Sequence, residues 1–283
     1  AEEAFAFAQV GQTIINAPDA KVIQLFVDDE PLTLPVADLL DYRRSLDFAE
    51  GVLERALTWR TPSGNRVQVR SRRMVSFTQR HLAVLTFEVT LLDRAAPVAI
   101  VSQVLNRQDG EEEYRTLHSD RVMADPRRAE EFTGRVLQPA VHWGDDERAI
   151  LGYRAMHSQM TLAVGADHTL ETANEHEVVT QVDEDVSRHV FRVHAEPGVP
   201  IRLSKAVSYH SSRGESPAEL AIRVRRTLDR VRVEGIERQF ADQRSWLDEY
   251  WARSDVEIEG QPEVQQAVRW NLFQVAQAVA RAE

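Results

Sequence analysis

The stretch HLAVLTFEVTL at residues 81–91 decides the fold class, because its large apolar side chains recur at every second position. Successive side chains of a β-strand point to opposite faces of a sheet, so this period indicates a strand. One face carries Ala83, Leu85, Phe87, Val89 and Leu91. The other face includes Thr86 and Glu88, so we expect a strand that is buried on one side only.

The same alternation recurs at residues 98–104, 160–164, 191–195 and 201–209. Between two apolar stretches, Thr61-Pro62-Ser63-Gly64-Asn65 supplies a proline that fixes φ and a glycine that tolerates positive φ. This composition predicts a hairpin and hence antiparallel neighbours. We therefore predict a mainly β fold, a large antiparallel β-sandwich over residues 1–212.

The pattern changes at Ser216, where Ser216-Pro217-Ala218-Glu219 forms a capping box with proline at the first helical position. An apolar stripe follows at helical spacing, consisting of Leu220, Val224, Leu228 and Val231. This stripe predicts a helix that is docked on the sandwich. Further helical patterns follow Gly235 and Pro262, so we expect linker helices over residues 213–259 and the start of a truncated helical unit over 260–283.

The last helical pattern is apolar around much of its circumference. One side of this helix carries Val264, Val268, Leu272, Val275 and Val279. The apolar surface extends further around the helix at Trp270, Phe273 and Ala280. Such a helix is normally buried, so it should either fold back on the linker helices or associate with another molecule. We expect association. The chain begins with Ala1 and ends at Glu283 inside this pattern, so we expect it to be a piece of a longer protein.

Charge and composition exclude several classes of partner. The 283 residues include 34 Lys+Arg and 45 Asp+Glu, giving a net charge of −11 with the acidic residues dispersed. Nucleic acid is therefore not an expected partner. No apolar stretch is long enough for a membrane span, and the N-terminus lacks the features of a signal peptide. With no cysteine, neither a disulfide nor a thiolate metal site can form, and we expect a cytoplasmic protein.

Signatures of catalysis and metal binding are missing from the sequence. It contains no G-x-S-x-G, P-loop or G-x-G-x-x-G motif. A helical zinc motif would need a second histidine at the position of Thr180 in His176-Glu177-Val178-Val179-Thr180. Asp183-Glu184-Asp185 lies between two strand patterns and is interpreted as a hairpin tip. We assign no catalytic residue, no metal ligand and no cofactor site.

Three residues remain as weak candidates for substrate contact: Arg73, His81 and Trp143. In a strand, Arg70 and Arg72 share one face while Arg73 points to the other, so a guanidinium must reach solvent or a carboxylate. A structural ion pair is the plainer interpretation, and a sugar or phosphate contact is the alternative. Trp143 stands in His142-Trp143-Gly144-Asp145-Asp146-Glu147, a turn-like acidic stretch where an aromatic ring could stack on a sugar.

Several segments resemble one enzyme family, in order along nearly the whole chain. LDFAEGVLER (46–55), WRTPSG (59–64), SRRMVS (71–76) and HLA (81–83) are similar to the N-terminal region of glycoside hydrolase family 65. WARSDVEIEG (251–260) and QAVRWNLFQ (266–274) resemble the passage by which that family enters its catalytic (α/α)₆ barrel. Two departures are Phe48-Ala49, where the family usually shows Met-Arg, and Trp270, where Phe is commoner.

The resemblance implies inverting phosphorolysis, or hydrolysis, of α-linked glucose disaccharides in the longer parent protein, with inorganic phosphate as co-substrate and no other cofactor. The catalytic glutamate and the phosphate pocket of that family belong to the barrel, beyond residue 283. The resemblance thus implies a non-catalytic scaffold domain whose partners are the missing barrel, an α-glucoside disaccharide and, in a homodimer, a second copy.

Two alternatives of other classes start from the same architecture. The predicted sandwich resembles the supersandwich of the aldose mutarotases, which are enzymes that use a histidine acid and a glutamate base. Free-standing activity of that kind requires one His and one Glu meeting in an open cleft. A carbohydrate-binding module would instead show aromatic side chains aligned on a concave exposed face.

Overall fold

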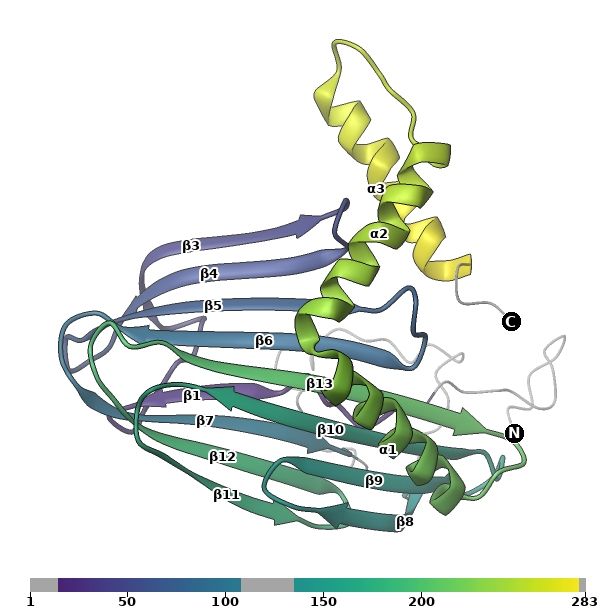
Figure 1. Ribbon diagram of the computed structural model, residues 1–283, viewed down its shortest axis with the longest axis horizontal. Coiled ribbons are helices and arrows are strands. Elements are labelled where there is room, and N and C mark those ends of the chain that lie inside the picture. Colours follow the sequence, from purple (N-terminus) through teal and green to yellow (C-terminus); the bar gives the residue numbers. More distant parts are fainter. Residues whose placement is uncertain (1–14, 108–134, 280–283) are drawn as a thin grey trace, which may run out of the picture.

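The computed structural model describes residues 15–107 and 135–279, which form two antiparallel β-sheets followed by three helices (Figure 1). The small sheet has the strand order β11-β12-β7-β1-β2. Its strands are β1 (Ile23–Val27), β2 (Glu30–Pro31), β7 (Ala96–Leu105), β11 (His176–Val182) and β12 (Val186–Ala195). The prediction of a mainly β, antiparallel sandwich is confirmed.

The large sheet has the order β3-β4-β5-β6-β13-β10-β9-β8. Its strands are β3 (Asp38–Asp47), β4 (Val52–Arg60), β5 (Arg66–Val75), β6 (Leu82–Leu91), β8 (Leu137–Gly144), β9 (Arg148–Ala155), β10 (Thr161–Glu171) and β13 (Ile201–Ser212). The last strand of the chain therefore lies in the middle of this sheet. It pairs with β6 on one side and with β10 on the other.

Both predicted hairpins are present. Gly64 has φ +88° in the turn between β4 and β5, and Asn65 Nδ2 donates a hydrogen bond to Arg94 O at 3.0 Å. Residues 183–185 connect β11 to β12, as expected for a hairpin tip. These connections could be read from the sequence because the turn residues set their geometry locally.

The main hydrophobic core fills the space between the sheets. From the small sheet it takes Leu25, Val27, Val98, Ile100, Phe191 and Val193, and from the large sheet Leu57, Trp59, Val67, Val69, Phe87, Val89, Ile201 and Leu203. Trp59 belongs to this core and offers no exposed ring. The expectation that one side of β6 faces solvent is wrong near its start. Leu82 and Val84 on that side are buried in a second cluster with Leu220 and Val224.

That second cluster is formed by α1 (Pro217–Glu234), which lies across the outer face of β9, β10 and β13 (Figure 1). Ser216 caps the helix, and its Oγ accepts a hydrogen bond from Glu219 N at 3.1 Å. All four residues of the predicted stripe are buried, so the prediction of a docked helix is confirmed. A Cβ at Gly165 on β10 would lie 2.5 Å from Val224 Cγ1, so only glycine permits this close packing.

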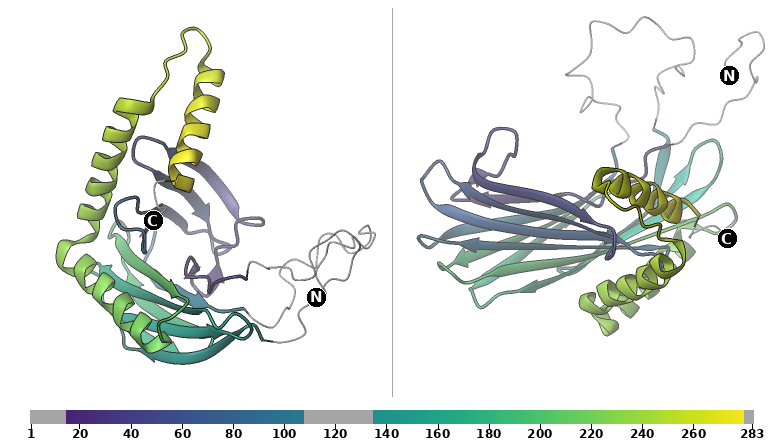
Figure 2. Two further views of the ribbon diagram at one scale, coloured as in Figure 1. Left: turned by 90° about the vertical axis from the view of Figure 1, so that its right-hand side faces the viewer. Right: turned by 90° about the horizontal axis from the view of Figure 1, so that it is seen from above.

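Gly235, with φ +86°, separates α1 from α2 (Ile236–Ser254), and α3 (Pro262–Val279) folds back along α2 (Figure 2). Tyr250 Oη donates a hydrogen bond to Leu272 O at 2.8 Å between these two helices. Of the two possibilities left open for α3, the structure shows the intramolecular contact, whereas self-association stays a prediction. None of the helices described is both long and apolar enough to cross a membrane.

Candidate functional site

The arginine cluster of β5 is divided between the two faces of the large sheet. Arg72 lies on the face that α2 approaches, where its Nε is 3.2 Å from Glu54 Oε1 and its guanidinium carbon is 4.2 Å from the centroid of Phe240. Arg70 is exposed on the same face. Arg72 therefore has carboxylate partners on this face, at a position that is partly exposed.

Arg73 points to the opposite, inner face, because it lies beside Leu85 in the register of β5 and β6. Burial and the positive charges of Arg55 and Arg44 lower the pKa of Arg73 below its usual value. Within the described residues Arg73 forms no salt bridge. The ion-pair interpretation therefore does not extend to Arg73, whose charged neighbours are Arg55 and Arg44.

His81 lies where the large sheet meets α1. Its ring stacks on that of His210 with centroids 3.8 Å apart, and its Nδ1 is 2.8 Å from Tyr209 O. His210 Nε2 is in turn 3.1 Å from Thr227 Oγ1 on α1. Burial, followed by the charges of His81 and Arg223, lowers the pKa of His210 to about 4. These contacts connect His81 to α1 through His210.

Trp143 belongs to strand β8, so the turn expected there begins only after Gly144. The guanidinium carbon of Arg225, on α1, lies 4.6 Å from the centroid of the Trp143 ring. Four strands of the large sheet separate β8 from β5. The structure therefore does not bring Trp143 and Arg73 into one site.

A charge network around the buried pair Arg148 and Asp167 connects α1 to the sheet. Arg148 Nη2 is 3.0 Å from Asp167 Oδ2, and Arg232 Nη2 is 2.5 Å from Asp167 Oδ1. Arg148 Nη1 also reaches Asp229 Oδ1 at 2.6 Å, and Arg232 pairs with Glu147. Sequence reasoning missed this network because its members belong to β9, β10 and α1, which lie far apart in the chain.

Separately from this network, several polar side chains are buried between the two sheets. Lys205 is fully buried, and its Nζ donates a hydrogen bond to Gln103 O at 2.9 Å. Burial lowers the pKa of Lys205 to about 7. Nearby, Ser102 Oγ is 2.8 Å from His168 Nε2, but both residues are buried. This pair is therefore not an accessible nucleophile and base.

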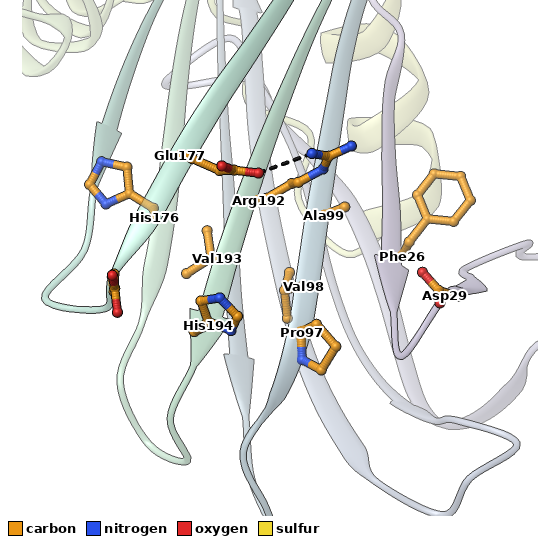
Figure 3. A pocket seen from close by; sticks show the side chains of 11 residues that line it. Phe26, Asp29, Pro97, Val98, Ala99, His176, Glu177, Arg192, Val193 and His194 are labelled. Carbon is orange, nitrogen blue, oxygen red and sulfur yellow. Dashed lines mark hydrogen bonds and ion pairs between the residues drawn. The ribbon is translucent and has the colours of Figure 1, made fainter.

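A hollow of about 410 Å³ lies on the outer face of the small sheet (Figure 3). Ala99 forms its floor because its side chain is small, with Arg192 and Phe26 beside it on the neighbouring strands. The hollow also gathers Asp29, Glu175, His176, Glu177 and His194. Glu177 Oε1 accepts a hydrogen bond from Arg192 Nη1 at 3.0 Å, so this carboxylate of the hollow is already paired.

No metal site accompanies this hollow. Across residues 15–107 and 135–279, no three His, Asp or Glu side chains are grouped closely enough to hold a metal ion. His176 lies on β11, in a strand and not in a helix, which agrees with the interpretation of its motif from the sequence.

An aromatic junction joins the helices to the end of the large sheet. We use this name for the cluster of Leu46, Phe48, Phe77, Trp246, Leu247, Tyr250, Trp251, Phe273 and Ala276. Phe77 stacks on Trp246 with centroids 4.5 Å apart, and Phe273 lies 5.5 Å from Phe48. Trp251 Nε1 donates a hydrogen bond to Phe48 O at 2.8 Å. Two loops of the sheet thus hold both α2 and α3.

Gln243 makes the polar connection at the same place. Its Oε1 accepts a hydrogen bond from Phe77 N at 2.9 Å, and its Nε2 lies 3.4 Å from Gly51 O. A Cβ at Gly51 would come within 2.6 Å of Gln243 Nε2, and Gly51 has φ +64°. Both the positive φ and the lack of space for a Cβ therefore require glycine at position 51. The aromatic junction thus combines ring contacts with a buried polar connection between the helices and the sheet.

This arrangement defines a class of protein: an antiparallel two-sheet sandwich domain that carries a helical extension. A solved structure described as a putative kojibiose phosphorylase from human microbiome contains the same fold, with a TM-score of 0.77 over 93% of this chain and 32% of that chain, at 15% identity. The chain belongs to glycosyl hydrolase family 65, because the model of the N-terminal domain of that family matches residues 1–250.

Curated relatives agree with this membership. An uncharacterized glycosyl hydrolase of Mycobacterium tuberculosis is 32% identical over 283 residues, covering 100% of this chain and 35% of the relative. The α,α-trehalose phosphorylase of Thermoanaerobacter brockii is 28% identical over 284 residues, covering 99% of this chain and 35% of that enzyme. The chain thus spans about a third of the length of the curated relatives that it matches.

Proposed function

We propose that the chain is the non-catalytic N-terminal scaffold domain of a family 65 glycosidase or phosphorylase that acts on α-linked glucose disaccharides. In this proposal residues 1–212 are the sandwich, residues 213–259 the linker and residues 260–283 the start of the catalytic barrel. The acid that protonates the leaving group, and the site for inorganic phosphate as co-substrate, belong to the rest of the polypeptide.

The aromatic junction is the observation that carries this proposal. It fixes α2 and α3 at one end of the large sheet, while Trp270, Val275 and Val279 on α3 stay exposed. A helix that is anchored on one side and apolar on the other is suited to packing against further helices. The remainder of the polypeptide is the proposed occupant. A homodimer and a cytoplasmic location remain predictions.

The test is turnover by the 283-residue chain. We expect no release of glucose 1-phosphate or glucose from maltose, trehalose, kojibiose or nigerose, with or without phosphate. Activity that persists through rigorous purification and follows the protein peak would contradict the scaffold proposal. A longer polypeptide that extends beyond residue 283 is the matched comparison, and it should be active.

The hollow of the small sheet supports one alternative, because it brings His176 and His194 close to Glu175 and Glu177. A histidine acid and a glutamate base are the groups that a mutarotase requires. Against this alternative, the Glu177 side chain is 63% exposed and paired with Arg192. Polarimetry of freshly dissolved α-glucose distinguishes the two functions, since only a mutarotase accelerates the approach to anomeric equilibrium above the buffer rate.

A further inference from the structure

Three arginines share the inner face of the large sheet near its β3 edge. Arg44 on β3 lies opposite Arg55 on β4, and Arg73 on β5 is diagonal to Arg55, which faces Ser71. Cβ atoms of directly opposed residues are about 5 Å apart, and those of diagonal residues about 7–8 Å. The three guanidinium groups can therefore reach a common point. We call these residues the arginine patch.

Among residues 15–107 and 135–279, no carboxylate is paired with the arginine patch. In the part of the chain that the structure describes, none of its members forms a salt bridge, whereas Arg72 on the opposite face approaches Glu50, Glu54 and Glu237. The residues beside the patch on the same face include Tyr42, Leu46, Leu53 and Ser71 on its own strands and Leu85 on β6. The chain has an excess of acidic residues, so a shortage of carboxylates does not explain the unpaired cations.

The patch is both partly buried and open. Arg55 and Arg73 are half-buried, and Arg55 Nε is shielded from solvent without a hydrogen-bond partner. An unpaired charge in such a position destabilises the fold. Arg44 and Tyr42 are exposed beside them, so a small ligand can reach the patch from solvent. Guanidinium groups stay charged at neutral pH despite the lowered pKa of Arg55 and Arg73.

We propose that the arginine patch binds a phosphate group, as inorganic phosphate or as the phosphoryl group of a small sugar phosphate. Guanidinium forks match phosphate oxygens with paired, charge-assisted hydrogen bonds, and a dianion can engage three forks at once. A single carboxylate would leave most of these donors unused. The half-buried positions of Arg55 and Arg73 favour a small ligand over a flat macromolecular surface. This inference stands independently of the scaffold proposal.

The test measures phosphate binding by the 283-residue chain. Calorimetric titration and the melting temperature are compared in phosphate, in chloride at equal ionic strength, in glucose 1-phosphate and in glucose 6-phosphate. We expect the melting temperature to rise with phosphate concentration but not with chloride, because a ligand that binds only the folded state stabilises it by mass action. Tighter binding of a sugar phosphate than of inorganic phosphate would identify the sugar phosphate as the source.

Variants of the patch make the test specific. Arg55→Gln and Arg73→Gln should each weaken phosphate binding at least about tenfold, the loss expected for charge-assisted hydrogen bonds. They should also raise the melting temperature in phosphate-free buffer, since an unpaired cation is removed. Arg44→Gln, at an exposed position, should weaken binding with little change in melting temperature. Arg70→Gln, exposed on the opposite face of β5, is the matched control and should alter neither quantity.

Three outcomes would overturn the proposal. The first is an equal stabilisation by chloride, and the second is an equal loss of binding in Arg70→Gln and Arg73→Gln. The third is binding of an acidic peptide such as polyglutamate with no measurable binding of phosphate, which would assign the patch to a protein partner.

Discussion

The rings of Phe48 and Trp270 are in contact, with their centroids 5.9 Å apart. Phe48 follows strand β3 near the start of the chain, whereas Trp270 belongs to the last helix. Both belong to the departures from the family pattern noted in the sequence, which are Phe48-Ala49 and Trp270. Phe48 and Trp270 therefore meet beside the aromatic junction, to which Phe48 belongs.

We predict that Phe48 and Trp270 are energetically coupled. Phe48→Met and Trp270→Phe restore the residues commoner in the family, and each should lower the free energy of unfolding. In a double-mutant cycle measured by urea unfolding, the two effects should differ from additivity by about 0.5–1.5 kcal/mol, the range for an aromatic pair. Strict additivity of the two changes would show that the contact contributes no interaction energy of its own.

Phe273→Ala should strongly destabilise the chain. Phe273 is fully buried in the aromatic junction, and truncation of a buried phenylalanine costs about 3–5 kcal/mol. Val275→Ala is the matched control on the same helix because Val275 is 54% exposed, and it should change the free energy of unfolding little. Similar urea midpoints for both variants would mean that α3 is not held at the junction in solution.

Deletion of α3 should lower stability and solubility. A chain that ends at Gly260 loses Phe273 and uncovers Phe48, Phe77 and Trp246. Self-association through the exposed side of α3 is better tested by a variant that keeps the helix. Val275→Glu is such a variant, because it places a charge at an exposed apolar position. Sedimentation should show less association in this variant than in the unaltered chain. A truncated chain with unchanged melting temperature would contradict the intramolecular contact.

Val224→Asp should lower the melting temperature markedly, because Val224 is fully buried against Gly165 under α1. A buried unpaired carboxylate costs several kcal/mol or forces the helix away from the sheet. Val233→Asp is the control on the same helix, where the valine is 88% exposed. Equal melting temperatures of the two variants, measured by circular dichroism, would show that α1 does not depend on this contact.

Lys205 should make stability rise with pH in the alkaline range. Its pKa is about 7 in the folded chain, against 10.5 when unperturbed. Between these values the unfolded chain binds a proton that the folded chain does not, so the free energy of unfolding increases from about pH 7 upward. Measurements should stop near pH 9.5, since burial raises the pKa of Tyr209 to about 12 and its ionisation in the unfolded chain opposes the trend.

Lys205→Met should be more stable than the unaltered chain at pH 7 and should lose this slope. Lys21→Met is the matched control because Lys21, the only other lysine, is exposed. Chemical denaturation at several values of pH provides the comparison. A slope that survives in Lys205→Met would assign the alkaline dependence to another group.

Local patterns determined what could be foreseen of the fold. The alternation around residues 81–91, the turn at Gly64 and the cap at Ser216 each depend on neighbours in sequence, and each predicted its element correctly. The order of the strands could not be derived, because nothing local to β13 shows that it lies between β6 and β10. The covered outer side of β6 was missed for the same reason.

The candidate site residues were harder to foresee than the strands. The sequence shows that Arg73 and Arg72 point in opposite directions, but not that Arg73 lies near Arg44 and Arg55. Trp143 contacts Arg225 of α1, and His81 stacks on His210, which in turn contacts Thr227 of α1. These contacts depend on the docking of α1 on the sheet. The alternation at 201–209 does place Lys205 on the inner face, which is the one signal that a charged group would be buried.

The central place of β13 has a consequence for the order in which the protein folds during synthesis. Until residues 201–212 leave the ribosome, the block of β3 to β6 and the block of β8 to β10 have no strand to join them. Each block then ends in an unpaired edge, at β6 and at β10, which is open to pairing with other chains. The large sheet therefore cannot be completed before β13 is available, however early the other strands have formed.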